Sequence, residues 1–278
     1  MNTILLRTLS IESVSGKPIT ADIRYTDSSV PQPVVLVFHG FKGFKDWGFF
    51  PFVCSEFARR GSICVCMNFS LNGYAQDSDK VNYPDDFARN TISLEIEEAR
   101  LTLRKIIDSF SAEFPQWNGE IYLLGHSRGG GIALLTGVLE SNTVSKVVVW
   151  NSIGTFERFS ERQKRLWRET GTFEVENSRT HQTLGMNVEF LNDIELHSKE
   201  FLLDSAAKSL GAKLLIIHGE QDMTVPVREA KKLAEINKAI SVQLIANTGH
   251  TFGAVHPFEL PTTALQSAIE HTSRFIGL

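Results

Sequence analysis

The chain has 278 residues, of which 42% are hydrophobic and 22% are charged, so we expect residues 1–278 to form one globular domain with room for an insertion. A net charge of −4 offers no basic surface, which argues against a nucleic-acid partner, and no apolar run is long enough to span a membrane. Residues 1–7 lack the apolar core and the small-residue cleavage site of a signal peptide, so we expect a cytoplasmic protein.

The three cysteines, Cys54, Cys64 and Cys66, are expected to be small core residues in a reducing compartment. Cys64 and Cys66 alternate along a predicted strand and therefore point to the same face, an arrangement that rarely forms a disulfide. The sequence contains no cluster of Cys and His with the spacing of a zinc site.

Strand-like and helix-like segments alternate along the chain, which predicts an α/β fold with a mostly parallel sheet covered on both faces. Residues 3–11 and 18–25 should form an antiparallel pair, and the continuous apolar run at 34–38 should be a strand buried on both faces. The remaining elements in chain order are a helix at 49–60, a strand at 63–68, a helix at 92–110, a strand at 121–124 with a helix after it, strands at 144–150 and 214–217, a helix at 227–238, a strand at 242–245 and a closing helix at 261–275.

Residues 152–206 break this alternation, because a crossover needs only one helix and this segment is far longer. It contains a charged helix at 157–169, with apolar residues including Trp167 along one side, and two short alternating strands at 172–176 and 180–184. An inert excursion is one interpretation. Because the segment follows the carboxyl end of a strand, where open α/β sheets bind ligands, we instead expect a small lid that shapes the pocket.

The segment Gly125-His126-Ser127-Arg128-Gly129 is the most informative stretch of the chain. This G-x-S-x-G pattern lies between a predicted buried strand and a predicted helix, which is the context of a nucleophile elbow. Glycines flank such a turn because a strained serine leaves no room for side chains beside it. A turn serine alone indicates a helix N-cap, whereas this context predicts a nucleophilic hydroxyl beside a helix N-terminus.

A serine nucleophile needs a general base, and His250 is the best candidate among the eight histidines. It lies in a loop of small residues after the last predicted strand, as the chain order of serine, acid and histidine requires. His256 directly precedes a proline, His218 ends a strand and favours a buried structural role, and the ring of His126 cannot readily reach the neighbouring serine Oγ.

Asp222 is the best candidate for the acid that orients this base. It lies just beyond the strand predicted at 214–217, one strand before the loop that carries the histidine. Glu220 is the nearest competitor, and a solvated loop carboxylate is the alternative interpretation of both residues. Asp193 and Asp204 also follow the elbow, but both lie within the 152–206 segment.

The backbone N–H groups of Phe41 and Arg128 are the expected donors to the oxyanion of an acyl-transfer reaction. Phe41 ends the His-Gly-Phe segment at 39–41, directly after the buried strand at 34–38. Arg128 follows the elbow serine, so its N–H lies at the start of the next helix and its side chain is incidental to this role.

Aromatic residues crowd the loop after the 34–38 strand, so some of them should line an apolar acyl or aromatic pocket. Simple core packing explains such a cluster equally well. From this loop, the elbow and the 157–169 helix, we expect Phe44, His126 and Trp167 to contribute to the substrate pocket.

These motifs give the chain a resemblance to the α/β-hydrolase superfamily over nearly its whole length. Residues 177–182 are similar to the hairpin insert of bacterial cytosolic carboxylesterases in the feruloyl/cinnamoyl-esterase and dienelactone-hydrolase-like groups. Ser127 stands where dienelactone hydrolases proper have cysteine and where haloalkane dehalogenases and epoxide hydrolases have aspartate, which argues against those activities. The segments that carry the resemblance to the superfamily are 39–41, 125–129, 219–222 and 249–252.

We therefore expect a serine esterase that cleaves small-molecule carboxylic esters through Ser127, His250 and Asp222 and an acyl-enzyme. This chemistry needs no metal or organic cofactor, and the loop at 40–43 lacks the Gly-Lys-Ser/Thr ending of a phosphate-binding loop. A small-substrate peptidase or amidase, or an acyltransferase, would use the same three side chains. A non-catalytic binder of a small apolar ligand is the alternative outside the enzymes.

Overall fold

Eight strands form one sheet in residues 3–278, the part of the chain that this computed structural model describes. Met1 and Asn2, which begin the segment tested for a signal peptide, lie outside this range. The strands in their order across the sheet are β1 (Ile4–Glu12), β2 (Pro18–Thr26), β4 (Ile63–Asn68), β3 (Gln32–Phe38), β5 (Trp117–His126), β6 (Val144–Trp150), β9 (Leu214–Gly219) and β10 (Ser241–Ile245).

The predicted α/β class and the mostly parallel sheet are confirmed. β1 and β2 pair antiparallel, β2 and β4 also pair antiparallel, and every neighbouring pair from β4 to β10 is parallel. The carboxyl ends of the parallel strands therefore meet at one edge of the sheet, where loops from different parts of the chain come together.

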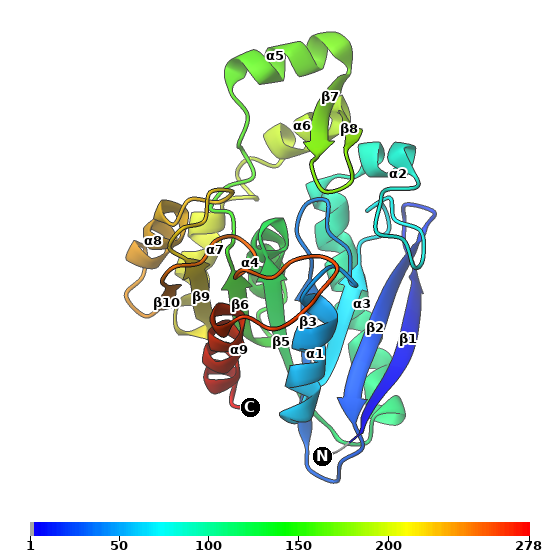
Figure 1. Cartoon of the computed structure of the whole chain (residues 1–278), viewed down its shortest axis with the longest axis vertical. Coiled ribbons are helices and arrows are strands. Elements are labelled where there is room, and N and C mark those ends of the chain that lie inside the picture. The colour runs from blue at the N-terminus through cyan, green and yellow to red at the C-terminus, as the bar shows by residue number, and fades with distance from the viewer. Residues whose placement is uncertain (1–2) are drawn as a thin grey trace.

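Helices cover both faces of this sheet (Figure 1). In the fully buried β3, Val34 and Leu36 belong to the apolar core that includes α3 and α4, whereas Val35 and Val37 belong to the core under α1 and α9. Burial on both sides explains the continuous apolar run in the sequence. The helices are α1 (Phe50–Arg59), α2 (Pro84–Arg89), α3 (Ile92–Glu113), α4 (Arg128–Leu139), α5 (Glu161–Thr170), α6 (Val188–Leu196), α7 (Leu203–Leu210), α8 (Arg228–Glu235) and α9 (Thr263–Ile276).

Within residues 3–278, no helix combines the length and the apolar composition that crossing a membrane requires.

The insertion (residues 152–206) contributes α5, α6 and a separate hairpin of β7 (Thr172–Asn177) and β8 (Gln182–Asn187). These elements lie beyond the carboxyl edge of the main sheet, with α5 outermost (Figure 1). Two predicted boundaries were wrong. The helix begins at Glu161 because Ser160 forms a capping box with Gln163, and the second strand begins at Gln182 because the turn is longer than expected.

The hairpin of the insertion rests on two loops of the main fold. The Lys42 ammonium donates to the carbonyl oxygen of Glu176 over 2.7 Å. The side-chain amide of Gln182 accepts from the N–H of Val81 over 3.0 Å and donates to the carbonyl of Val81 over 2.8 Å. The turn end of the hairpin is therefore anchored to the loops that follow β3 and β4.

Candidate active site

Ser127 occupies a strained turn between β5 and α4. Its backbone has φ 57° and ψ −120°, a region that side-chain-bearing residues rarely adopt and that marks functional turns. A Cβ at Gly125 would lie 2.1 Å from the carbonyl oxygen of Gly129, and a Cβ at Gly129 would lie 2.4 Å from that of His39. The elbow therefore needs both glycines for close backbone packing rather than for a positive φ.

The structure brings Asp222 and His250 together across two loops that are 28 residues apart in sequence. His250 Nδ1 donates to Asp222 Oδ2 over 2.7 Å, and the N–H groups of Thr224 and Val225 each donate to Oδ1 over 2.8 Å. Burial alone would raise the pKa of the Asp222 carboxyl, but these hydrogen bonds outweigh it and hold the pKa below its ordinary value. An ionised Asp222 fixes the Nδ1–H tautomer of His250 and leaves Nε2 free to accept a proton.

The competing residues occupy other positions. Glu220 is exposed, and its backbone N–H donates to the carbonyl of Ile245 over 3.0 Å. His218 is fully buried and donates from Nε2 to the carbonyl of Val225 over 2.8 Å, which stabilises the loop around Asp222. His218 therefore has the structural role that its position at a strand end predicted.

The Ser127 hydroxyl makes no hydrogen bond to any group in residues 3–278, His250 included. It is 9% exposed, and the His250 ring lies 4.8 Å from the ring of the adjacent His126. A Cβ placed on Gly40 would lie 3.4 Å from the Ser127 Oγ, so the loop after β3 passes directly beside the hydroxyl. Hydrogen bonds between nucleophile and base are often long in enzymes without substrate and shorten when substrate binds.

The loop after β3 is held in place by His39. Its Nδ1 donates to the carbonyl of Gly40 over 2.9 Å, and its Nε2 accepts from the N–H of Phe69 over 3.4 Å, which requires a neutral ring. Complete burial lowers the pKa of His39 to about 4. Within residues 3–278 the N–H groups of Phe41 and Arg128, the two predicted oxyanion donors, donate to no acceptor.

The Arg128 side chain joins three parts of the structure, a role that the sequence did not suggest. Its guanidinium donates to Glu95 Oε1 of α3 over 2.5 Å, and both side chains are almost fully buried. The Arg128 Cζ lies 4.6 Å from the ring centre of Phe41 and 5.9 Å from that of Phe190 in α6. The guanidinium therefore packs between the loop after β3 and the insertion, and Asn90 donates to the same Glu95 oxygen.

Only one of the three expected pocket residues borders an open groove. Phe44 lies beside a groove of about 1000 Å³ that runs along β1 and β2, and its ring contacts Tyr74 at 4.4 Å. The prediction that Trp167 lines the pocket is wrong, because its side chain is 0% exposed and its Nε1 donates to the carbonyl of Met186 inside the insertion. His126 is also buried, and its ring faces the His250 loop instead of a cavity.

Asn151, just after β6, is a polar residue at this edge that sequence reasoning missed. Its Nδ2 donates to the carbonyl of His250 over 2.8 Å, and its Oδ1 accepts from the N–H of Gly219 over 2.7 Å. His126 Nε2 donates to the same His250 carbonyl over 2.8 Å. The signal was an asparagine at the carboxyl end of a buried strand, which is where functional groups gather in parallel sheets.

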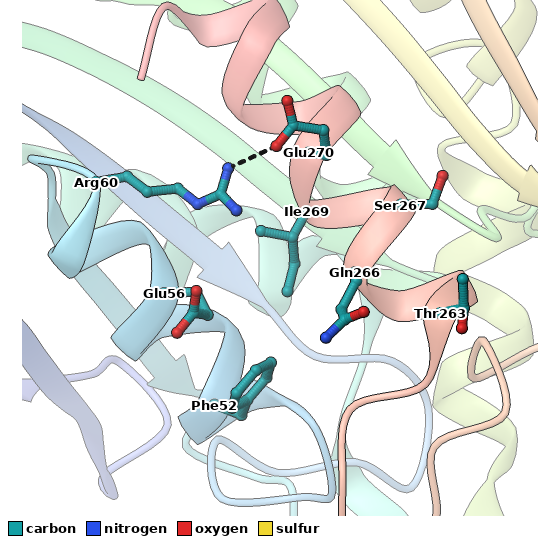
Figure 2. A pocket seen from close by; sticks show the side chains of 8 residues that line it. All are labelled: Phe52, Glu56, Arg60, Thr263, Gln266, Ser267, Ile269 and Glu270. Atoms are coloured by element: carbon teal, nitrogen blue, oxygen red, sulfur yellow. Dashed lines mark hydrogen bonds and ion pairs between the residues drawn. The ribbon is translucent and has the colours of Figure 1, made fainter.

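A second cleft of about 530 Å³ lies between α1 and α9, away from these residues (Figure 2). An ion pair between Arg60 and Glu270 bridges it at 3.0 Å, and the other side chains at its wall are mainly polar. The cleft contains none of the candidate catalytic residues. In the described residues, no group of three or more His, Cys, Asp or Glu side chains is arranged to hold a metal ion.

Comparison with solved structures identifies the fold as that of the α/β hydrolases, as the motifs predicted. Est1E from Butyrivibrio proteoclasticus with ferulic acid bound is 16% identical, and the match covers 97% of this chain and 100% of that chain with a TM-score of 0.68. The α/β hydrolase GrgF from Penicillium sp. sh18 is 14% identical, with 98% of each chain covered and a TM-score of 0.67. A dienelactone hydrolase from Anabaena variabilis ATCC 29413 is 14% identical, with coverages of 99% and 97% and a TM-score of 0.64. No protein-family model and no curated protein matches the chain.

Proposed function

We propose that the protein is a serine hydrolase of small carboxylic esters, with Ser127 as nucleophile, His250 as general base and Asp222 as the residue that orients the base. The observation that carries this proposal is the 2.7 Å bond between His250 Nδ1 and Asp222, beside a strained serine at the carboxyl edge of the sheet. The α/β-hydrolase fold favours a hydrolase, but the proposal depends on the residues of the site.

In the first half-reaction His250 Nε2 takes the proton of Ser127 Oγ while Oγ attacks the ester carbonyl carbon. The negative charge on the carbonyl oxygen is stabilised by the N–H groups of Phe41 and Arg128. The tetrahedral intermediate then collapses, the ester C–O bond breaks, and the alcohol leaves with the proton from His250. A water molecule, deprotonated by His250, then attacks the acyl-enzyme carbonyl. The bond from the acyl carbon to Ser127 Oγ breaks, His250 returns the proton to Oγ, and the acid is released.

We also propose that residues 1–278 act as one domain in which the insertion serves as a lid. Its position beyond the carboxyl edge and its contact with Arg128 through Phe190 support a role in shaping the acyl pocket. The bound ferulic acid in Est1E makes aromatic acid esters a reasonable class to test. The three buried free thiols agree with the cytoplasmic location that the sequence predicts.

The test combines ester turnover with covalent labelling of the intact protein. The wild type should hydrolyse p-nitrophenyl acetate or butyrate and react with a fluorophosphonate, and S127A should do neither. S152A is the matched control, because Ser152 is a buried neighbour whose hydroxyl, within residues 3–278, bonds only the carbonyl of Ile153. Wild-type turnover by S127A would overturn the proposal. Cleavage of aminoacyl-p-nitroanilides without cleavage of esters would indicate an amidase. Transfer of the acyl group to an added alcohol would indicate an acyltransferase, and a failure of the fluorophosphonate to label the protein would indicate a non-catalytic binder.

A further inference from the structure

We propose that His126 and Asn151 are positioning residues, which aim the His250 imidazole at Ser127 by holding the main-chain carbonyl of His250. The inference rests on the proposed function, because it assigns a role in directing the base. Both side chains bond the main chain of His250, and in residues 3–278 neither bonds the Ser127 hydroxyl, so both act through His250.

The carbonyl of His250 accepts two buried hydrogen bonds from two different strand ends. His126 Nε2, at the end of β5, and Asn151 Nδ2, just after β6, each donate over 2.8 Å. Two donors saturate the lone pairs of one carbonyl oxygen. At the other end of the residue, Nδ1 is held by Asp222 over 2.7 Å. His250 is thus fixed at its backbone and at its ring, and these two points together set the direction of Nε2.

Asn151 is suited to this role because its side chain supplies both a donor and an acceptor, and because its backbone adopts a positive φ that most residue types avoid. It is fully buried with φ 47°, and its own N–H donates to the carbonyl of Ile217 over 2.9 Å. Its Oδ1 accepts from Gly219, three residues before Asp222. The acid loop and the base loop are therefore tied to one asparagine, a residue type that tolerates left-handed φ.

His126 is suited to the same role because it donates without carrying a charge. Bonding to a carbonyl requires a proton on Nε2, and burial, together with the nearby His250, lowers the pKa of His126 to about 3. Its ring packs edge-on against Phe49 at 5.3 Å and Phe50 at 6.2 Å. A charged ring here would repel the imidazolium that His250 becomes during turnover, since the two ring centres are 4.8 Å apart.

The bonds within the loop hold the neighbours of His250 rather than His250 itself. His250 lies between Gly249 and Thr251, its side chain is 18% exposed, and the nearest local bonds are those from Phe252 N–H to the Gly249 carbonyl and from Ala254 N–H to the Thr251 carbonyl. Without the two donors, the bond to Asp222 is the remaining hydrogen bond of His250 itself in residues 3–278, so the imidazole should be oriented less firmly.

The test compares H126F and N151G with H126Q in the full-length protein. H126F removes the donor, N151G keeps the positive φ but removes both side-chain bonds, and H126Q restores a neutral donor. H126F and N151G should lower kcat by up to about 10²-fold with little change in KM, as expected for a displaced base. H126Q should recover most of the loss. The His250 Nδ1 proton, bonded to Asp222 over 2.7 Å, should give a proton NMR signal far downfield that broadens in H126F and sharpens again in H126Q.

T102V serves as the structural control, because it deletes a buried hydrogen bond of 2.9 Å from Thr102 Oγ1 to the carbonyl of Glu98 within α3, which packs on the opposite face of the sheet from α9. It should change stability and leave kcat and the downfield proton unaltered. If S127A is inactive while folded H126F keeps the wild-type kcat and Nδ1 signal, this inference fails and the proposed function stands. If N151G does not fold, the comparison of H126F with H126Q decides alone. An active S127A would overturn the proposed function instead.

Discussion

Two buried neutral histidines should make this protein lose stability in mild acid. The pKa values of His39 and His126 are lowered by burial to about 4 and about 3, whereas in the unfolded chain a histidine titrates at about 6.5. Between these values the unfolded chain binds protons that the folded protein cannot accept. Stability is therefore present above pH 6.5 and falls as the pH drops below it.

The magnitude follows from the two pKa shifts. Lowering the pH from 7.5 to 5.5 costs about 1.4 kcal/mol for each histidine, because the unfolded form becomes almost fully protonated while the folded form stays neutral. Together His39 and His126 should remove about 2.7 kcal/mol, a large fraction of the 5–15 kcal/mol typical of globular proteins. Burial also lowers the pKa of His218, which adds to the effect in the same direction.

The assay is urea unfolding of wild type and H126Q at pH 7.5 and pH 5.5, with the free energy of unfolding extrapolated to water. H126Q should lose about 1.4 kcal/mol less than the wild type over this interval, whatever its stability at neutral pH. All other titrating groups are common to both proteins, so their contributions cancel in the difference. Equal acid dependence in the two proteins would show that His126 accepts a proton in the folded state, and would refute the reasoning.

Four substitutions test other parts of the site. D222N should lower kcat by about 10⁴-fold because it removes the charge that fixes the tautomer of the base, whereas E220Q should match the wild type in the same ester assay. G40A should lower kcat by about 10²- to 10³-fold with normal folding by circular dichroism, because its Cβ would lie 2.9 Å from the Cβ of Ser127 and displace an oxyanion donor. E95Q should reduce the free energy of unfolding in urea by about 3 kcal/mol, because it leaves a buried guanidinium without its counter-charge; a loss below 1 kcal/mol would contradict that account.

The sequence was sufficient for features that depend on local chemistry and chain order. The elbow glycines, the buried strand before them and the loop positions of Asp222 and His250 follow from turn geometry and from parallel strand topology. The start of α3 at Ile92 was also predictable, and the structure shows Thr91 capping it through the N–H of Leu94.

The sequence was insufficient wherever the direction of a side chain depends on its tertiary neighbours. A tryptophan on one side of a charged helix suggested a pocket, yet Trp167 packs against Phe173 and Phe190 in the core of the insertion. Arg128 could not be paired with Glu95 in advance, because the two residues come from different helices. The short α2 has no apolar periodicity and begins at Pro84, so the pattern that reveals long helices could not reveal it.

The guanidinium of Arg128 limits how freely the insertion can be exchanged. Since one side chain packs against both Phe41 and Phe190, a hairpin and helix grafted from a related protein would have to present a ring at position 190 or leave one side of a buried cation without its partner. Residues 152–206 should therefore not be exchanged alone. A chimera should take α6 and the loop after β3 from the same parent protein.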